Sequence, residues 1–172
     1  MSIYKICSVL LEYPEQELLE ALSEIRVLID EETRLKEQEH FALEQFFKYL
    51  HSHDLTDLQV QYVKTFDLTP EHSLHLTHHL FGDERGRGPA LIDLAEYYKE
   101  YGLQVDEREL PDYLPMILEF CAQLDVGEAG LFLGQTVKVL EQLAKNLEKA
   151  DSPYAPLVRV VENLGRLTRI AA

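Results

Sequence analysis

Apolar residues recur every three or four positions along most of this chain, which is the spacing that places side chains on one face of an α-helix. Leu18, Leu22 and Ile25 are one example. The sequence lacks the alternating apolar and polar runs, bounded by Asn-Gly or Asp-Gly turns, that are typical of β-hairpins. The pattern therefore predicts an all-α fold.

Prolines, glycines and short polar stretches divide the helical pattern into about eight to nine segments. The expected helices lie near 1–13, 15–30, 43–50, 56–67 with Thr56 as its cap, a short stretch through His79, 89–101, 111–123, 128–147 and 153–167. The chain has 172 residues and no repeat of fixed period, so these helices are expected to pack as one single-domain bundle over 1–172.

The charge of the chain restricts its partners. There are 31 acidic and 16 basic residues, a formal net charge of -15, which opposes nucleic acid and anionic lipid and favours cationic partners such as basic peptides. The alternative is that the acidity only keeps the protein in solution. The N-terminal stretch lacks the pattern of a secretory signal, and no apolar run approaches about 18 residues. We therefore expect a cytoplasmic protein without direct membrane insertion.

The segment 109–123, ELPDYLPMILEFCAQ, would be apolar almost all round as a helix, apart from one acidic strip. Asp112 and Glu119 fall within roughly 20° of each other in that strip. A carboxylate on a mostly buried helix needs a cation or hydrogen-bond donors. The partner could be an internal arginine, with Arg85 and Arg87 as candidates, or a basic ligand, or the strip could face solvent.

Four histidines lie close together at His72, His75, His78 and His79. His75 and His79 have the spacing that can share one metal ion on a helix. The residue after His75 is Leu76, however, where a catalytic HExxH motif would need glutamate. Surface or hydrogen-bonded histidines are the favoured interpretation, and a metal-dependent helical-bundle enzyme is the alternative.

No other pattern in the sequence indicates catalysis. The segment GDERGRG at 82–88 lacks the Gly-Lys-Ser/Thr ending of a phosphate-binding loop. No Ser/His/Asp or Cys/His arrangement suggests a nucleophile with its base. The sequence therefore predicts no enzyme, no catalytic residue, no metal and no cofactor.

Three motifs follow one another in a recognisable order: YVKTFD at 62–67, His79 with GDERGRGPALIDL at 82–94, and ELPDYLP through LEF at 109–120. Together they resemble the delta subunit of respiratory nitrate reductase, within the TorD-like group of redox-enzyme maturation chaperones. The resemblance implies an all-helical chaperone that binds the N-terminal region of the apo catalytic (alpha) subunit. The chaperone would keep that subunit competent for molybdenum cofactor insertion and membrane assembly. A permanent structural subunit is a further alternative.

The resemblance also implies which residues bind the peptide. Tyr62, Phe66, Leu114 and Phe120 are expected to form apolar groove surface, Asp67, Asp112 and Glu119 to supply negative charge, and His79 and Arg87 to belong to the same site. Two positions depart from the family pattern, which has an acid between the two arginines and a polar residue after the glycine. Gly86 and Pro89 stand there in this chain.

Overall fold

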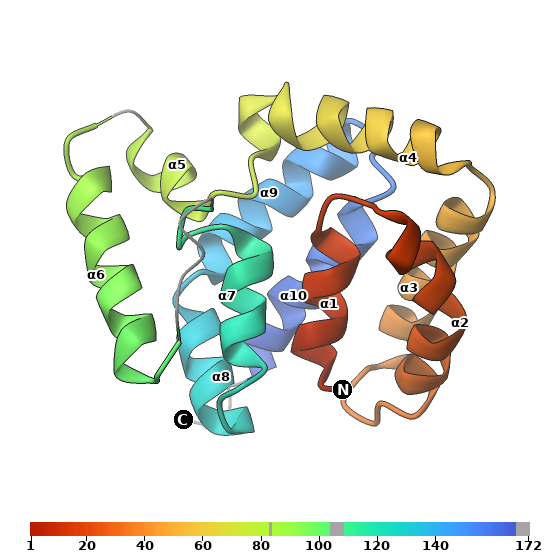
Figure 1. Cartoon of the computed structure of the whole chain (residues 1–172), viewed down its shortest axis with the longest axis horizontal. Coiled ribbons are helices and arrows are strands. Elements are labelled where there is room, and N and C mark those ends of the chain that lie inside the picture. Colours follow the sequence, from red (N-terminus) through yellow and green to blue (C-terminus); the bar gives the residue numbers. More distant parts are fainter. Residues whose placement is uncertain (83, 104–108, 168–172) are drawn as a thin grey trace.

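The computed structural model describes residues 1–82, 84–103 and 109–167, and these residues form ten α-helices and no β-strand (Figure 1). The predicted all-α fold is confirmed. The helices are α1 (Ile3–Leu11), α2 (Gln16–Asp30), α3 (Glu37–His51), α4 (Leu55–Tyr62), α5 (Leu76–Phe81), α6 (Arg87–Glu100), α7 (Leu114–Cys121), α8 (Val126–Gly134), α9 (Val137–Lys149) and α10 (Ala155–Leu167). A π-helical turn, η1 (Val63–Asp67), continues α4, and a 3₁₀ turn, η2 (Pro70–His72), follows it.

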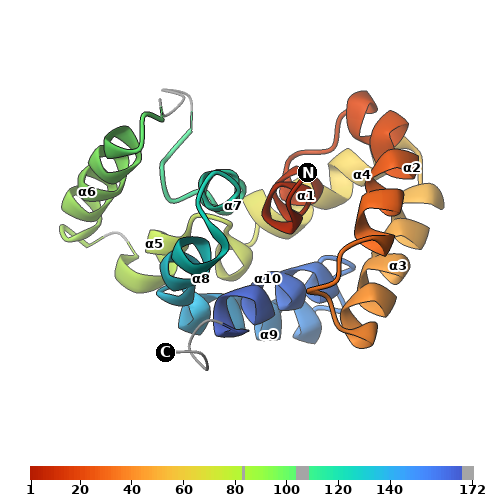
Figure 2. The ribbon, with the colours of Figure 1, turned by 90° about the horizontal axis from the view of Figure 1, so that it is seen from below.

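The helices form a bundle built around α1 and α7, which pack side by side. Figure 2 shows α9 and α10 along one side of this pair, α2 and α3 at one end of the molecule, and α5 and α6 at the other. The apolar faces predicted from sequence meet in one core cluster drawn from α1 to α5 and α7 to α10. Helix α6 stands apart from this cluster, since Tyr98 is its one buried residue.

Local sequence signals set several helix ends. The side chains of Ser2, Asp54 and Asp125 cap α1, α4 and α8 by accepting a hydrogen bond from a backbone N–H three residues later. The expected cap at Thr56 is therefore wrong, because Asp54 already satisfies the first turn of α4. Gly102 follows α6 with φ of 79°, the left-handed conformation in which glycine commonly ends a helix.

Two expected helices differ from the observed ones. The single helix expected over 128–147 is two helices, α8 and α9, which separate at Gln135 and Thr136. The helix expected from Pro111 begins only at Leu114, because the backbone before it pairs with another segment. Leu76 N donates to Asp112 O (3.0 Å) and Leu114 N donates to Leu74 O (2.8 Å). Asp112 therefore precedes α7 and is not part of a helical strip with Glu119.

Candidate functional site

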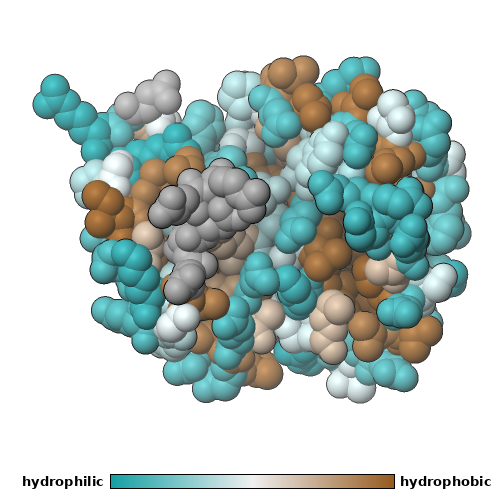
Figure 3. Space-filling model, in the orientation of Figure 1, coloured by the Kyte–Doolittle hydropathy of each residue, from teal (hydrophilic) through white to brown (hydrophobic). Residues whose placement is uncertain are grey.

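A cleft of about 800 Å³ opens between α1, α2 and the segment that precedes α7. Its floor is apolar and is made by Val9 on α1 with Leu18, Ala21, Ile25 and Leu28 on α2. Leu18 and Ile25 belong to the core stripe of α2, whereas Ala21 and Leu28 are half-exposed beside it. Figure 3 shows apolar surface recessed between hydrophilic side chains on this half of the molecule. The cleft therefore offers an apolar strip to a partner.

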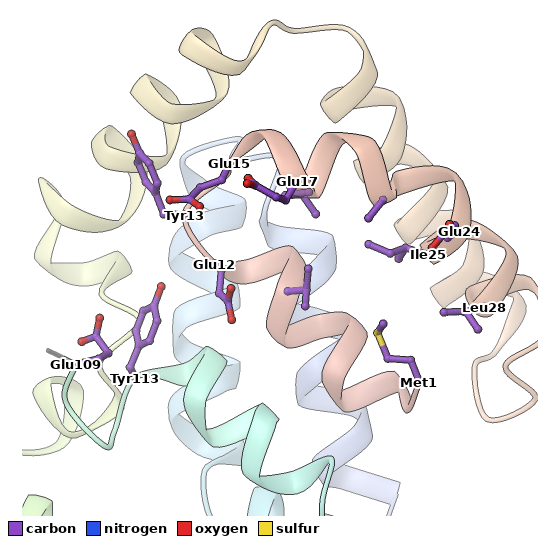
Figure 4. Close-up of a pocket in the computed structure, with 13 residues that line it drawn as sticks. Met1, Glu12, Tyr13, Glu15, Glu17, Glu24, Ile25, Leu28, Glu109 and Tyr113 are labelled. Atoms are coloured by element: carbon purple, nitrogen blue, oxygen red, sulfur yellow. The ribbon is translucent and has the colours of Figure 1, made fainter. Parts of the chain in front are cut away.

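Acidic side chains surround this apolar floor. The acidic rim of the cleft consists of Glu12, Glu15, Glu17, Glu24 and Glu109, and among the described residues no lysine, arginine or histidine lines the cleft with them. Figure 4 shows the rim along both sides, with Tyr13, Tyr113 and Glu109 at one end and Met1 and Leu28 at the other. Five carboxylates around one apolar surface produce a field that attracts a cation-bearing ligand.

The pKa of Glu12 depends on its burial and on the charged groups around it. Burial raises the pKa of Glu12, while the neighbouring Lys5 lowers it and Glu119 raises it. Lys5 Nζ lies 2.6 Å from Glu119 Oε1, in an ion pair that joins α1 to α7 at the surface. Glu119 is 49% exposed, but its charge is balanced by Lys5, so the pair adds no net negative charge to the acidic rim.

The structure separates the two predicted acids of the 109–123 segment. Asp112 is only 1% exposed, and its Oδ2 accepts hydrogen bonds from Thr77 N (2.9 Å) and Thr77 Oγ1 (2.5 Å). The guanidinium of Arg87 lies 3.8 Å from the same oxygen. Of the alternatives left open by the sequence, the internal pair is correct for Asp112. Glu119 lies at the surface and is also paired internally, with Lys5 rather than with an arginine.

The predicted apolar groove residues lie in the interior. Tyr62, Phe66, Leu114 and Phe120 are 3%, 5%, 0% and 1% exposed. Tyr62 Oη donates to Leu11 O (2.9 Å), and its ring packs edge-on against Phe66. These four side chains are therefore core residues in this structure, and their contact with a peptide stays a prediction. Strongly apolar helix faces pack against each other because this packing removes the most apolar surface from water.

The remaining predicted residues lie at three separate places. Asp67 is exposed at the end of η1. His79 is half-buried, with Nε2 2.7 Å from Ser73 O, and burial lowers its pKa. Arg87 is the first residue of α6 and donates through Nε to Thr77 Oγ1 (3.0 Å). Asp83, within the GDERGRG segment, lies outside the described residues.

The histidine cluster is held by hydrogen bonds. His72 Nδ1 lies 3.1 Å from Thr65 O, and His75 Nε2 lies 2.9 Å from Glu109 Oε1. His78 packs against the ring of His79. Within the part of the chain that the structure describes, no three His, Cys, Asp or Glu side chains are placed to hold a metal ion. These contacts match the hydrogen-bonded interpretation for His72, His75 and His79.

The cleft residues on α1 and α2 were not predicted as a site. A weak signal was present, because the apolar stripe of α2 is broadened by Ala21 and Leu28 and flanked by Glu17 and Glu24. Such a broadened stripe is consistent with a core helix as well as with a binding surface.

None of the described helices combines the length and the apolar composition that a bilayer crossing needs.

The described residues thus form an all-helical protein with an acid-rimmed apolar cleft, a surface chemically complementary to basic amphipathic segments. Comparison with known proteins identifies the family. The family model described as nitrate reductase delta subunit matches residues 15–159, and the chain belongs to this family. The family predicted from the three sequence motifs is thereby confirmed.

Individual relatives are similar over most of the chain. The nitrate reductase molybdenum cofactor assembly chaperone NarJ of Escherichia coli (strain K12) is 39% identical over 152 residues, which cover 88% of this chain and 64% of that protein. The probable NarJ chaperone of Bacillus subtilis (strain 168) is 34% identical over 166 residues, covering 94% of this chain and 89% of the relative. The nitrate reductase-like protein NarX of Mycobacterium tuberculosis (strain H37Rv) is 32% identical over 164 residues, but these are 24% of that longer protein.

Proposed function

We propose that this chain is an assembly chaperone for a nitrate reductase, without catalytic activity of its own. It binds the N-terminal region of the apo catalytic subunit in the cytoplasm and keeps that subunit competent for molybdenum cofactor insertion. Family membership supports this role, as do the names of the relatives, which describe cofactor assembly.

The acid-rimmed cleft is the observation on which the proposed peptide site depends. An amphipathic helix can lay its apolar face on the partly exposed strip made by Val9, Ala21 and Leu28. Its lysine or arginine side chains then reach the acidic rim. Apolar burial supplies most of the affinity, while the carboxylates select a cationic partner.

The charge requirement can be tested by calorimetric titration with a synthetic peptide that corresponds to the N-terminus of the catalytic subunit. The variant is Glu12→Gln/Glu17→Gln/Glu24→Gln, and the matched control is Glu20→Gln, an exposed acid of α2 that does not line the cleft. Each exposed carboxylate contributes about 0.2–1 kcal/mol, so the triple variant should bind roughly 3- to 100-fold more weakly. Glu119→Gln alone should lose less than about fivefold.

The apolar floor can be tested with a substitution that fills it. Ala21→Arg places a long cationic side chain in the cleft, whereas Ser23→Arg adds the same group on the same helix at an exposed position that does not line the cleft. We expect Ala21→Arg to abolish measurable peptide binding and Ser23→Arg to change the affinity less than threefold. Equal binding by both variants would exclude this cleft as the peptide site, and no binding by the wild type would refute the proposed function.

A chaperone and a permanent subunit differ in how many copies of the chain remain with the finished enzyme. A chaperone leaves when assembly is complete, so the chain should co-purify with the apo catalytic subunit and be missing from the purified, active reductase. Quantitative mass spectrometry of both preparations measures this difference. One copy of the chain per active enzyme would favour the structural-subunit alternative.

A further inference from the structure

Two residues of the cleft wall, Glu109 and Tyr113, lie on a short non-helical segment before α7. One turn hydrogen bond, from Tyr113 N to Leu110 O (3.1 Å), lies within this segment, and its other backbone groups need partners outside it. The backbone on either side of His75 pairs with it through Asp112 O and Leu114 N. The Tyr113 ring also packs on His75, with ring centroids 5.3 Å apart, and His75 contacts Glu109.

A buried polar cluster holds the same segment from the side away from the cleft. Arg87 Nε donates to Thr77 Oγ1 (3.0 Å), and Thr77 Oγ1 donates in turn to Asp112 Oδ2 (2.5 Å). The three residues come from α6, α5 and the wall segment. Asp112 immediately precedes Tyr113, so a displacement of its carboxylate moves a residue that lines the cleft.

The Asp112 carboxylate depends strongly on this cluster. It is buried, and among the described residues its Oδ1 has no hydrogen-bond partner. Among the described residues, the contacts that offset the cost of burying this carboxylate therefore all act on Oδ2. They come from Thr77 and Arg87. A buried carboxylate that loses a donor tends to move toward water or recruit a new partner, because its desolvation is no longer offset.

Helix α6 contacts the wall segment at a second point. Tyr98 Oη donates to Pro111 O (2.9 Å), and Tyr98 is 1% exposed. Helix α6 itself contributes no residue to the cleft. Helix α6 nevertheless contacts the cleft wall directly at Pro111, and it connects to Asp112 through Thr77.

We propose that Thr77, Arg87 and Asp112 are positioning residues for the peptide cleft, which couple α6 to the wall formed by Glu109 and Tyr113. This inference rests on the proposed function of the cleft. It assigns Arg87 an indirect role, in place of the direct peptide contact that the family resemblance implies. The shape of the cleft, and hence the affinity for the client helix, then depends on where α6 is held.

The first test compares substitutions that remove a contact of the buried polar cluster with matched substitutions that keep it. Thr77→Val keeps the size of the side chain but removes the hydroxyl, and Thr77→Ser restores the hydroxyl. Arg87→Ala removes the guanidinium, and Arg85→Ala removes an equal charge from an exposed position two residues away. Peptide affinity is measured by calorimetry at a temperature where thermal unfolding shows each variant to be folded.

We expect Thr77→Val and Arg87→Ala to weaken peptide binding roughly five- to tenfold, which is the range typical of coupled neighbouring groups. Thr77→Ser and Arg85→Ala should bind within about twofold of wild type. Wild-type affinity in both Thr77→Val and Arg87→Ala, with the wild type itself binding, would overturn the positioning role and leave the proposed function intact. Loss of binding by the wild type would refute the proposed function instead.

A double-mutant cycle separates positioning from direct contact. Glu109→Gln/Tyr113→Ala removes the wall groups that the cluster is proposed to place. In that background Arg87→Ala should have less than a twofold effect on the affinity, because the wall no longer contributes. An undiminished effect of Arg87→Ala in the same background would show that Arg87 contacts the client itself, and would overturn the inference.

Discussion

Replacing Gly165 with alanine should destabilise the protein, although alanine is the better helix former. Gly165 lies in α10, where that helix crosses α8 and α9. A Cβ atom at this position would lie 2.9 Å from Val137 Cγ2 and 3.2 Å from the carbonyl oxygen of Leu133. The Val137 methyl can shift only into a packed core, and the Leu133 oxygen is fixed by its helix.

The magnitude follows from two opposing contributions. Alanine gains up to about 1 kcal/mol over glycine inside a helix. Forcing an extra carbon into a packed interior costs about 1–3 kcal/mol. The 2.9 Å approach to Val137 places the cost at about 2–3 kcal/mol, so we expect a net loss of about 1–2 kcal/mol in the free energy of unfolding. This loss corresponds to a fall in Tm of about 2–8 °C for a chain of this size.

Urea denaturation followed by circular dichroism gives the free energy of unfolding directly. Val137→Ala provides the matched control, because it removes the methyl group that the new carbon would meet. In the Val137→Ala background, Gly165→Ala should cost less than it does in the wild type. A Gly165→Ala protein as stable as the wild type, or more stable, would show that the helices separate freely and that the close approach does not require glycine.

Further predictions concern charge and metal. Partial burial of the otherwise exposed Glu12 raises its folded-state pKa, so its ionised form costs stability above that pKa. Glu12→Gln should therefore raise the urea midpoint slightly at pH 7, and this gain should vanish as the pH falls below the unfolded-state pKa of about 4.3. Glu162 is 2% exposed and bridges Arg159 and Arg166, so Glu162→Gln should cost about 1–3 kcal/mol in urea denaturation, whereas Glu96→Gln, which breaks an exposed pair, should cost less than about 0.5 kcal/mol. Elemental analysis of untagged protein should find no stoichiometric zinc, iron or manganese that His75→Ala removes; such a metal would support the enzyme alternative.

Much of the fold follows from the sequence because helical periodicity reports burial directly. The stripe Leu18, Leu22, Ile25 and Ile29 is buried on α2, as its spacing indicates. The division between α8 and α9 could not be predicted in the same way. No proline marks it, and the apolar pattern continues across Gln135 and Thr136. Only the packing of both helices on α10 separates them.

The candidate site was less predictable, because an apolar side chain has the same sequence signature in a core as in a cleft. Leu114 and Phe120 satisfy either interpretation, and their environment is decided by helices distant in sequence. The partner of Asp112 was among the alternatives considered, since few arginines are available. The acidic rim, however, combines α1, α2 and Glu109, and only the tertiary arrangement brings them together.

The fold depends on the number of residues in the π-helical turn η1. Leu68 N donates to Val63 O (3.0 Å), a bond across five residues, so this turn holds one residue more than an ordinary helical turn. Deleting any one residue of 63–67 would let α4 continue regularly, but would rotate everything beyond it by about 100°. The hydrogen bond from Asn146 Nδ2 on α9 to Glu71 O on η2 (3.0 Å) would then be lost. Homologues that differ in length here should carry compensating changes in η2.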